Sequence, residues 1–244
     1  ESGSTPEMVE SIFDQMYHAA ASLGISVVGG HTEITYDLRR PILNGTLIGE
    51  VERGRLITPD QMQPGDRLLL TKGVPIEGTA LLAREFAEKL RPILSEAEIN
   101  EAQRFLYEPG ISVVRDAQTA ARAGRVHGMH DPTEGGLAGA LWELAEAGRC
   151  RLLVERDAVY IPPLAARVCA AFGLNPLATI ASGALLIAAA QEDALPIRRA
   201  LEAEGIACSE IGRVEEGPAG VWQPDGSPLP RPARDNIARV FEEN

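Results

Sequence analysis

The chain has 244 residues, of which 45% are hydrophobic, and a formal net charge of −12, as expected of a globular protein with one large or two modest domains. This acidic balance, with no Lys/Arg-rich run, argues against non-specific binding to nucleic acid or to anionic membranes. The three cysteines are far apart in the sequence, which suggests free thiols in a reducing compartment. The longest apolar run (residues 178–190) is too short to cross a bilayer, and no signal peptide is visible. We therefore predict a cytoplasmic protein.

The first part of the chain predicts a helix followed by β-strands. Residues 6–23 carry apolar side chains at helical spacing, and Gly24 follows them, which predicts a helix that ends there. The predicted strands are residues 25–28, 31–36 and 41–51. Three strands are too few to close a sheet and leave open edges. We therefore expect two copies of the chain to pair through these strands as a homodimer.

A glycine pair separates the first two predicted strands. Gly29-Gly30 is followed by His31, Thr32 and Glu33. An ordinary hairpin turn is one explanation of such a pair between two β-like runs. The functional alternative is that the glycines let a phosphate approach backbone N–H groups, with His31 and Thr32 adding polar contacts. At the level of these residues both interpretations stay open.

A turn after the predicted strand at residues 67–71 is a near miss for a P-loop. Gly73 and Gly78 have the right spacing, but Thr79 and Ala80 stand where lysine and serine or threonine belong. We reject the P-loop on that ground. A strand, a glycine loop and a helix start still form a plausible anion-facing turn, although most such turns are only structural.

The rest of the chain alternates helices and strands, which predicts an α+β (mixed α/β) fold. Further helices are expected up to residue 86 and over residues 96–105, 112–123, 137–147, 163–172 and 194–204. Further strands are expected over residues 151–155, 179–188 and 206–214. A loop with prolines and a glycine, residues 57–66, marks the candidate domain boundary. The last stretch is Pro-rich and ends in an amphipathic segment at residues 237–241, so we expect a surface tail that docks late.

The most informative stretch is the acid, the proline and the two glycines before the helix predicted at residues 137–147. Asp131 is a favoured N-cap, Pro132 suits the first helical position and a capping box needs an acid such as Glu134. Capping does not explain the pair Gly135-Gly136, since glycine weakens a helix unless the backbone must approach a ligand or another element closely. A helix start with bare N–H groups binds anions, and Asp131 could hold a cation that bridges to that anion.

Three segments together resemble the aminoimidazole ribonucleotide synthetase-related superfamily. They are Gly-Gly-His-Thr-Glu at 29–33, Asp-Pro-Thr-Glu-Gly-Gly-Leu at 131–137 and Ala-Ser-Gly-Ala-Leu-Leu at 181–186. This superfamily includes selenophosphate synthetase, thiamine-monophosphate kinase and the hydrogenase maturation factor that makes the cyanide ligand. The Asp-Pro-Thr version of the central motif is most similar to the hydrogenase maturation branch.

The resemblance implies an ATP- and Mg²⁺-dependent enzyme that transfers a phosphoryl group, with an acceptor that the sequence does not name. It also implies the end of a β-rich nucleotide-binding and dimerisation domain over residues 1–58. A larger C-terminal domain with a mixed sheet and packed helices would then occupy residues 64–216, and a Pro-rich tail residues 217–244. In such proteins ATP and Mg²⁺ lie between the domains, and phosphoryl transfer depends mostly on positioning and charge neutralisation.

The resemblance also implies which residues form the site. The residues expected beside the nucleotide phosphates are Gly29, Gly30, His31, Thr32, Gly135 and Gly136. Asp131 is expected to hold magnesium, with Glu33 as a weaker second candidate. No residue is assigned a catalytic role.

Two departures from the superfamily affect the function that we expect. The superfamily's first domain normally begins well before residue 1 and supplies further acidic ligands, so we expect a truncated chain that folds but does not turn over ATP. Hydrogenase maturation factors end in a cysteine after a Pro-Arg pair, whereas Pro230-Arg231 is followed by Pro232 and Ala233 and no cysteine. We therefore do not expect cyanide synthesis. The alternative to an enzyme is a non-catalytic nucleotide-binding or scaffold homologue in metallocentre maturation, and a third possibility is that the glycine motifs only serve packing.

Overall fold

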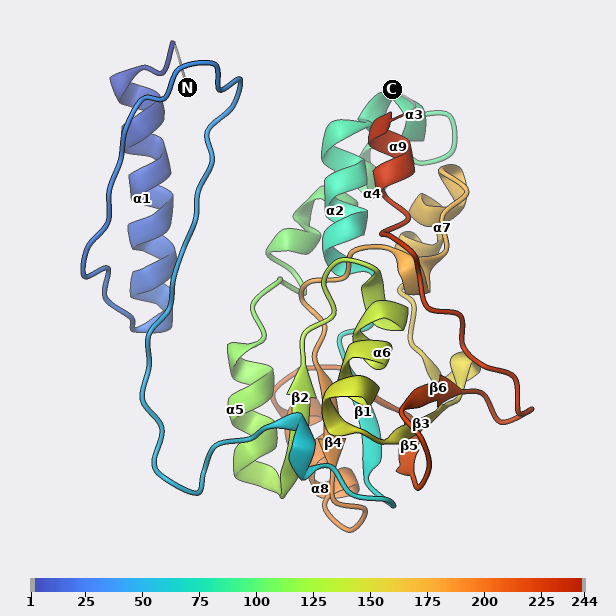
Figure 1. Ribbon diagram of the computed structural model, residues 1–244. Coiled ribbons are helices and arrows are strands. Elements are labelled where there is room, and N and C mark those ends of the chain that lie inside the picture. Colours follow the sequence, from blue (N-terminus) through green and yellow to red (C-terminus); the bar gives the residue numbers. More distant parts are fainter. Residues whose placement is uncertain (1–2, 243–244) are drawn as a thin grey trace. The chain divides into compact units, whose positions relative to one another are not determined.

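The computed structural model describes residues 3–242 and has the α+β fold that the sequence predicts (Figure 1). The chain divides into two compact units, residues 1–52 and 53–244, and each is described here by itself. No helix among the described residues is long and apolar enough to cross a membrane.

The first unit contains one helix, α1 (Pro6–Leu23), with the bounds that the sequence predicts. Its start is fixed by Thr5, whose hydroxyl accepts a hydrogen bond from the Met8 N–H at 3.3 Å. Its end is fixed by Gly24, which has a left-handed φ of +67° and donates its N–H to the last turn. Only glycine adopts this conformation without strain, so the sequence signal and the observed helix end coincide.

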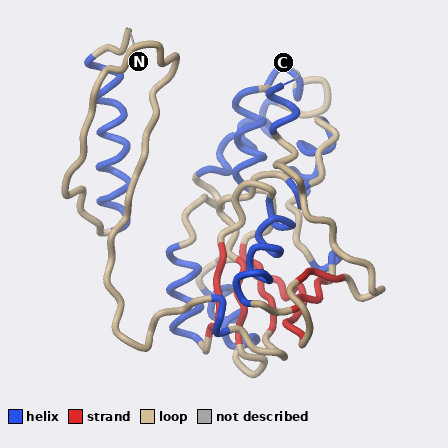
Figure 2. The backbone as a smooth tube through the Cα atoms, viewed as in Figure 1, coloured by secondary structure: helices blue, strands red, loops and turns tan. Residues whose placement is uncertain are grey.

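The prediction of three strands after α1 is wrong. Within residues 25–52, all of them described, no strand is formed, and Figure 2 draws the whole segment as loop. A β-like sequence becomes a strand only when a neighbour supplies the matching N–H and C=O groups, and a lone hairpin is marginal at best. Apolar side chains of this segment are consequently exposed, with Val28 94% and Ile48 92% accessible.

The second unit is built on a six-stranded sheet with the order β2-β4-β1-β5-β3-β6. The strands are β1 (Arg67–Thr71), β2 (Val126–His130), β3 (Arg151–Val154), β4 (Leu186–Ala189), β5 (Cys208–Glu215) and β6 (Gly220–Trp222). All neighbouring pairs are antiparallel except β3 and β6, which are parallel. The sheet is therefore mixed.

The helices of this unit confirm most of the sequence predictions to within a few residues. They are α2 (Ile76–Glu85), α3 (Ala87–Leu90), α4 (Glu96–Gln103), α5 (Val114–Ala123), α6 (Gly136–Gly148), α7 (Pro163–Ala171), α8 (Ala194–Ala203) and α9 (Ala238–Glu242). The strand predicted at residues 179–188 begins only at Leu186. Gly183 bends the chain before it with φ of +111°, and a Cβ there would lie 2.9 Å from the Gly110 carbonyl oxygen.

The core follows from the alternation of side chains along the central strand β1. Leu68 and Leu70 are fully buried in one cluster with Leu141 and Leu144 of α6, whereas Leu69 packs with Ile197 of α8 in another. Successive residues of a strand point to opposite faces. Helix α6 therefore covers one face of the sheet, and α5 and α8 cover the other. A third cluster joins the helices α2, α4 and α7.

Candidate functional site

Helix α6 begins four residues later than the capping hypothesis for Asp131 predicts. Its N-cap is Gly135 with φ of +79°, and its first residue, Gly136, has φ of +60°. Two successive left-handed glycines turn the chain into the helix, and no side chain caps it. The assignment of Asp131 as N-cap and Pro132 as first helical residue is therefore wrong. Asp131 is left 60% exposed at the tip of the preceding loop.

Gly135 and Gly136 are each glycine for a different structural reason. A Cβ on Gly136 would lie 2.5 Å from the Thr179 carbonyl oxygen and 2.8 Å from that of Leu177, so this glycine lets another backbone segment approach. A Cβ on Gly135 would meet nothing nearer than the Gly139 Cα at 3.6 Å. The expected close approach at Gly136 is thus made by protein rather than by a ligand, whereas a Cβ on Gly135 would make only ordinary van der Waals contacts.

The backbone N–H groups at the start of α6 are only partly used. The Gly135 N–H donates to the Asp235 carboxylate at 2.7 Å, and the Gly136 N–H donates to the Thr133 carbonyl at 2.9 Å. Among the described residues, no acceptor takes a hydrogen bond from the N–H groups of Leu137 and Ala138. Bare first-turn N–H groups favour an anion, as the sequence predicts for this loop.

The carboxylate of Asp131 belongs to a small surface group. The His130 Nδ1 lies 3.8 Å from an Asp131 oxygen, and its Nε2 lies 2.8 Å from a carboxylate oxygen of Glu143 on α6. Residues 3–242 contain no group of three or more His, Cys, Asp or Glu side chains arranged to hold a metal ion. In this part of the described chain Asp131 is thus an exposed carboxylate that does not belong to a preformed set of metal ligands.

The other predicted site residues lie in the first unit. Gly29, Gly30, His31 and Thr32 are exposed, and a Cβ on either glycine would meet no atom within 4 Å. His31 Nε2 lies 3.5 Å from a carboxylate oxygen of Glu33. The hairpin interpretation of the glycine pair is wrong because no strand flanks it. The predicted phosphate-binding residues thus form two groups, one in each unit.

In the turn that nearly matches a P-loop, the glycine N–H groups already have acceptors within the protein. At the start of α2 the Glu77 N–H donates to the Ser182 carbonyl at 3.3 Å, and the Gly78 N–H donates to the Ile180 carbonyl at 3.0 Å. These two N–H groups are therefore not available to an anion. A Cβ on Gly78 would lie 2.8 Å from the Thr179 Cγ2, so the segment before β4 packs against the first turns of both α2 and α6. That segment leads directly into the third motif, whose Ser182 carbonyl accepts the Glu77 N–H.

A buried charged network at the end of β1 was not predicted from the sequence. Lys72 Nζ lies 3.3 Å from Asp116 Oδ2, and their side chains are 6% and 2% exposed. The ammonium also donates to the Ser112 carbonyl at 2.8 Å, and the Thr71 hydroxyl donates to Asp116 Oδ1 at 2.6 Å. Burial lowers the pKa of Lys72, and the Asp116 charge opposes that shift. The available signal was a charged residue that closely follows the three successive leucines of β1.

Lys72 also lines a groove of about 700 Å³ together with Arg115, Tyr160 and Arg167. Its ammonium is fully engaged in the network, and the two arginines pair with Glu204 and Glu98. The groove therefore presents charges that are already neutralised. It offers no free cation for a phosphate among these residues.

The cysteines do not provide a nucleophile. Burial raises the pKa of Cys169 and of Cys208 to about 12, and it also raises the pKa of Cys150. The thiolate is the reactive form of cysteine, so these thiols are inert at neutral pH. All three are free rather than joined in disulfides.

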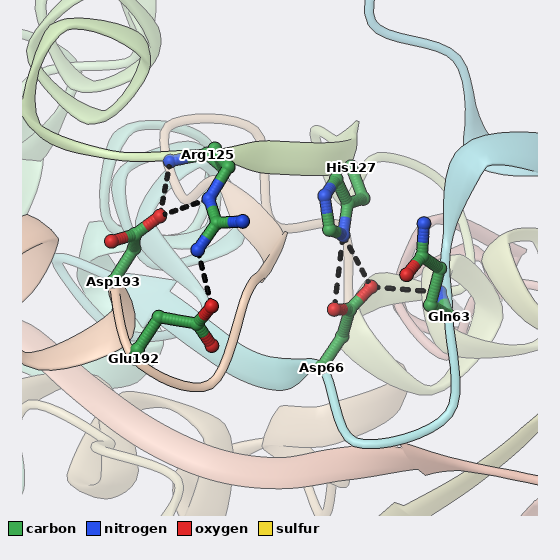
Figure 3. Close-up of polar contacts among 6 residues, drawn as sticks. All are labelled: Gln63, Asp66, Arg125, His127, Glu192 and Asp193. Carbon is green, nitrogen blue, oxygen red and sulfur yellow. Dashed lines mark hydrogen bonds and ion pairs between the residues drawn. The ribbon is translucent and has the colours of Figure 1, made fainter.

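A second polar cluster fixes the segment before β1 to the edge strand β2 (Figure 3). Asp66, which is buried, lies 2.9 Å and 3.0 Å from the His127 Nδ1 through its two oxygens, and it also accepts the Gln63 N–H at 2.8 Å. Nearby, Arg125 pairs with Asp193 and Glu192, and its hydrogen bonds hold the pKa of Asp193 below its usual range. The Asp66 contacts attach the segment before β1 to β2, and the Arg125 contacts attach the start of β2 to the segment before α8.

Comparison with known proteins places this arrangement in one family. The model of the AIR synthase related protein C-terminal domain matches residues 63–223, and that of the N-terminal domain matches residues 1–51. A protein of Methanocaldococcus jannaschii named for hydrogenase expression and formation is 28% identical over 92% of this chain and 68% of its own length. The carbamoyl dehydratase HypE of Rhizobium leguminosarum bv. viciae is 27% identical over 84% of this chain and 57% of its own length.

A third relative, the phosphoribosylformylglycinamidine cyclo-ligase of Thermococcus kodakarensis, is 33% identical over 52% of this chain and 39% of its own length. The chain thus spans between about two fifths and two thirds of the curated relatives named here.

Solved structures share the fold. The crystal structure of E. coli HypE, a hydrogenase maturation protein, aligns with a TM-score of 0.75 at 21% identity, over 97% of this chain and 72% of that chain. A structure of HypE in complex with ATP aligns with a TM-score of 0.65 at 20% identity, over 96% of this chain and 71% of that chain. Since the C-terminal model alone matches more than half of the sequence, the chain belongs to the AIR synthase related protein family.

Proposed function

We propose that the protein is an ATP- and Mg²⁺-dependent enzyme that transfers a phosphoryl group to a small-molecule acceptor. The observation that supports it most is the start of α6, where two left-handed glycines leave first-turn N–H groups without acceptors beside an exposed Asp131. Two fold relatives support a nucleotide: one is titled HypE in complex with ATP, and another is titled AaThiL complexed with AMPPCP and TMP, with a TM-score of 0.55.

The residues present fit a magnesium ion that is shared with phosphates. Mg²⁺ in phosphoryl-transfer sites is bound through one or two carboxylates plus phosphate oxygens and water. Asp131 would hold the ion, Glu33 is a weaker candidate ligand, and the bound ion would neutralise charge on the phosphates. The N–H groups that follow Gly135 and Gly136 would orient the anion through the helix dipole. We also propose that Gly29, Gly30, His31 and Thr32 contact nucleotide phosphates.

Asp131→Asn is expected to weaken Mg-ATP binding by at least about ten-fold without changing stability, because it removes an anionic oxygen ligand. Since Asp131 does not cap α6, the fold loses no hydrogen bond to the helix. Calorimetric titration of the natural full-length protein with Mg-ATP measures the effect. Glu134→Gln is the matched control, because it removes one exposed acidic charge from the same loop. Equal affinity in the Asp131→Asn variant and the control would show that the metal role is wrong.

A non-catalytic nucleotide-binding or scaffold homologue in metallocentre maturation is the second candidate. It is supported by the relatives, which are named for hydrogenase expression and formation or as carbamoyl dehydratase. Phosphate release from ATP by the full-length protein separates the two functions. Release above the level of the Asp131→Asn variant supports an enzyme, and binding without release supports the scaffold.

We also propose that two copies pair through the segment after α1. Its apolar side chains are exposed, and this segment supplies the β-like sequence that finds no partner in the unit. Sedimentation velocity at micromolar concentration is expected to show a dimer, and Ile48→Asp is expected to shift it toward monomer. Ile93→Asp places the same charge at an exposed isoleucine of the other unit and should leave the dimer intact. A wild-type monomer at this concentration would contradict the pairing.

A further inference from the structure

The C-terminal tail runs along α6 and back toward the start of that helix. The Trp142 indole N–H of α6 donates to the Leu229 carbonyl at 2.9 Å, and Arg231 forms an exposed ion pair with Glu146 at 2.6 Å. Further on, Ile237 and Val240 are buried in the helical cluster of α2, α4 and α7. The tail is therefore attached to the second unit along its course rather than hanging free.

Between these attachments, Asp235 reaches the glycine loop. Its Oδ2 accepts the Gly135 N–H at 2.7 Å, and its Oδ1 accepts the Ile237 N–H at 2.8 Å. The neighbouring Asn236 N–H donates to the Ala178 carbonyl at 2.9 Å, which fixes the backbone of the tail at the same place. The carboxylate is thus held on one side by its own turn and on the other by a residue 100 positions earlier in the chain.

We propose that Asp235 is a positioning residue that clamps Gly135 in its left-handed conformation and so keeps the loop from Asp131 to Gly136 in the form that binds phosphate. This inference rests on the proposed function for its ligand, and on the hydrogen bonds above for its geometry. Both carboxylate oxygens are engaged by N–H groups, and a negative charge at the N-terminus of α6 is favourable. The N–H groups of Leu137 and Ala138, both of which are buried residues, stay without acceptors among the described residues, so the clamp does not use the N–H groups that the proposed ligand needs.

The clamp can be tested without any nucleotide. Amide hydrogen exchange followed by NMR on the full chain reports the Gly135 N–H directly. Asp235→Ala is expected to raise its exchange rate by about ten-fold or more, since a hydrogen bond to a charged acceptor is lost. Asp235→Asn keeps the size but only one acceptor oxygen, so it should raise the rate less. Arg231→Gln removes an ion pair of the same tail that does not touch the loop, and it should leave the rate of Gly135 unchanged.

Calorimetry with Mg-ATP on the full-length protein then tests the consequence. Asp235→Ala is expected to bind about ten-fold more weakly than wild type, and Arg231→Gln to bind like wild type. Unchanged exchange at Gly135 in Asp235→Ala would overturn the clamp. Tighter Mg-ATP binding in Asp235→Ala would also overturn it, because Asp235 would then be an internal competitor for the phosphate. A wild-type protein that binds no Mg-ATP would overturn the proposed function, whereas the exchange result decides the clamp independently.

Discussion

Lys72→Met is expected to lower the free energy of unfolding of the second unit by about 3–5 kcal/mol, because it leaves a buried carboxylate without its counter-charge. Asp116 is 2% exposed and lies 3.3 Å from the Lys72 ammonium. The remaining hydrogen bond from the Thr71 hydroxyl neutralises no charge. Methionine matches the length of the lysine stem and is no more strained than lysine at this left-handed position, where φ is +58°. Urea denaturation followed by circular dichroism measures the loss.

Two further variants separate the buried charge from a general effect of removing a cation. Arg104→Gln breaks an exposed ion pair with Glu108 and is expected to cost less than about 1 kcal/mol. Adding Asp116→Leu to Lys72→Met removes the stranded carboxylate, so the double variant should be more stable than the single one. A Lys72→Met protein as stable as the Arg104→Gln protein would mean that the pair carries no net stabilisation.

The sequence predicts elements well where the determining signal is local. The bounds of α1 depend on Thr5 and Gly24, which act within one helical turn of each end. The strand β1 has three successive leucines between Arg67 and Thr71, and its bounds are also those expected. In both cases the residues that decide the structure are adjacent in sequence, so their pattern is sufficient.

Predictions fail where a distant residue decides the structure. Local capping rules place the start of α6 at Asp131, but Thr179 and Asp235 determine it, the first by contact with Gly136 and the second by its bond to Gly135. The Lys72 network depends on Asp116, which follows 44 positions later in the chain. No pattern within a window of a dozen residues contains this information.

At the candidate site, too, local signals were predictable from the sequence and distant contacts were not. Helix propensity predicts that the pair Gly135-Gly136 has an unusual backbone requirement, since glycine weakens a helix. Whether that backbone approaches a ligand or another element was not predictable, and the structure shows that Gly136 approaches the backbone of Leu177 and Thr179. The predicted role of Asp131 in holding magnesium stays a prediction. Its exposure removes the competing explanation that it only caps the helix.

Gly136→Ala is expected to cost about 3 kcal/mol or more, since it combines a left-handed alanine with an unavoidable overlap. The new Cβ would lie 2.5 Å from the Thr179 carbonyl oxygen and 2.8 Å from that of Leu177. Both obstacles are backbone atoms, so no side chain can rotate away to relieve the contact. Either α6 or the segment before β4 would have to move, and this segment also packs against Gly78 of α2.

Gly135→Ala is the matched control for this prediction. Its φ of +79° imposes the same left-handed conformation, but its Cβ would lie no closer than 3.6 Å to another atom. It should therefore cost only about 1–2 kcal/mol, the penalty for that conformation alone. The difference between the two variants in urea denaturation isolates the close approach between α6 and the chain at Thr179. If the two variants are equally stable, conformational strain alone explains the glycine pair, and the close approach of Leu177 and Thr179 to α6 is not what requires Gly136.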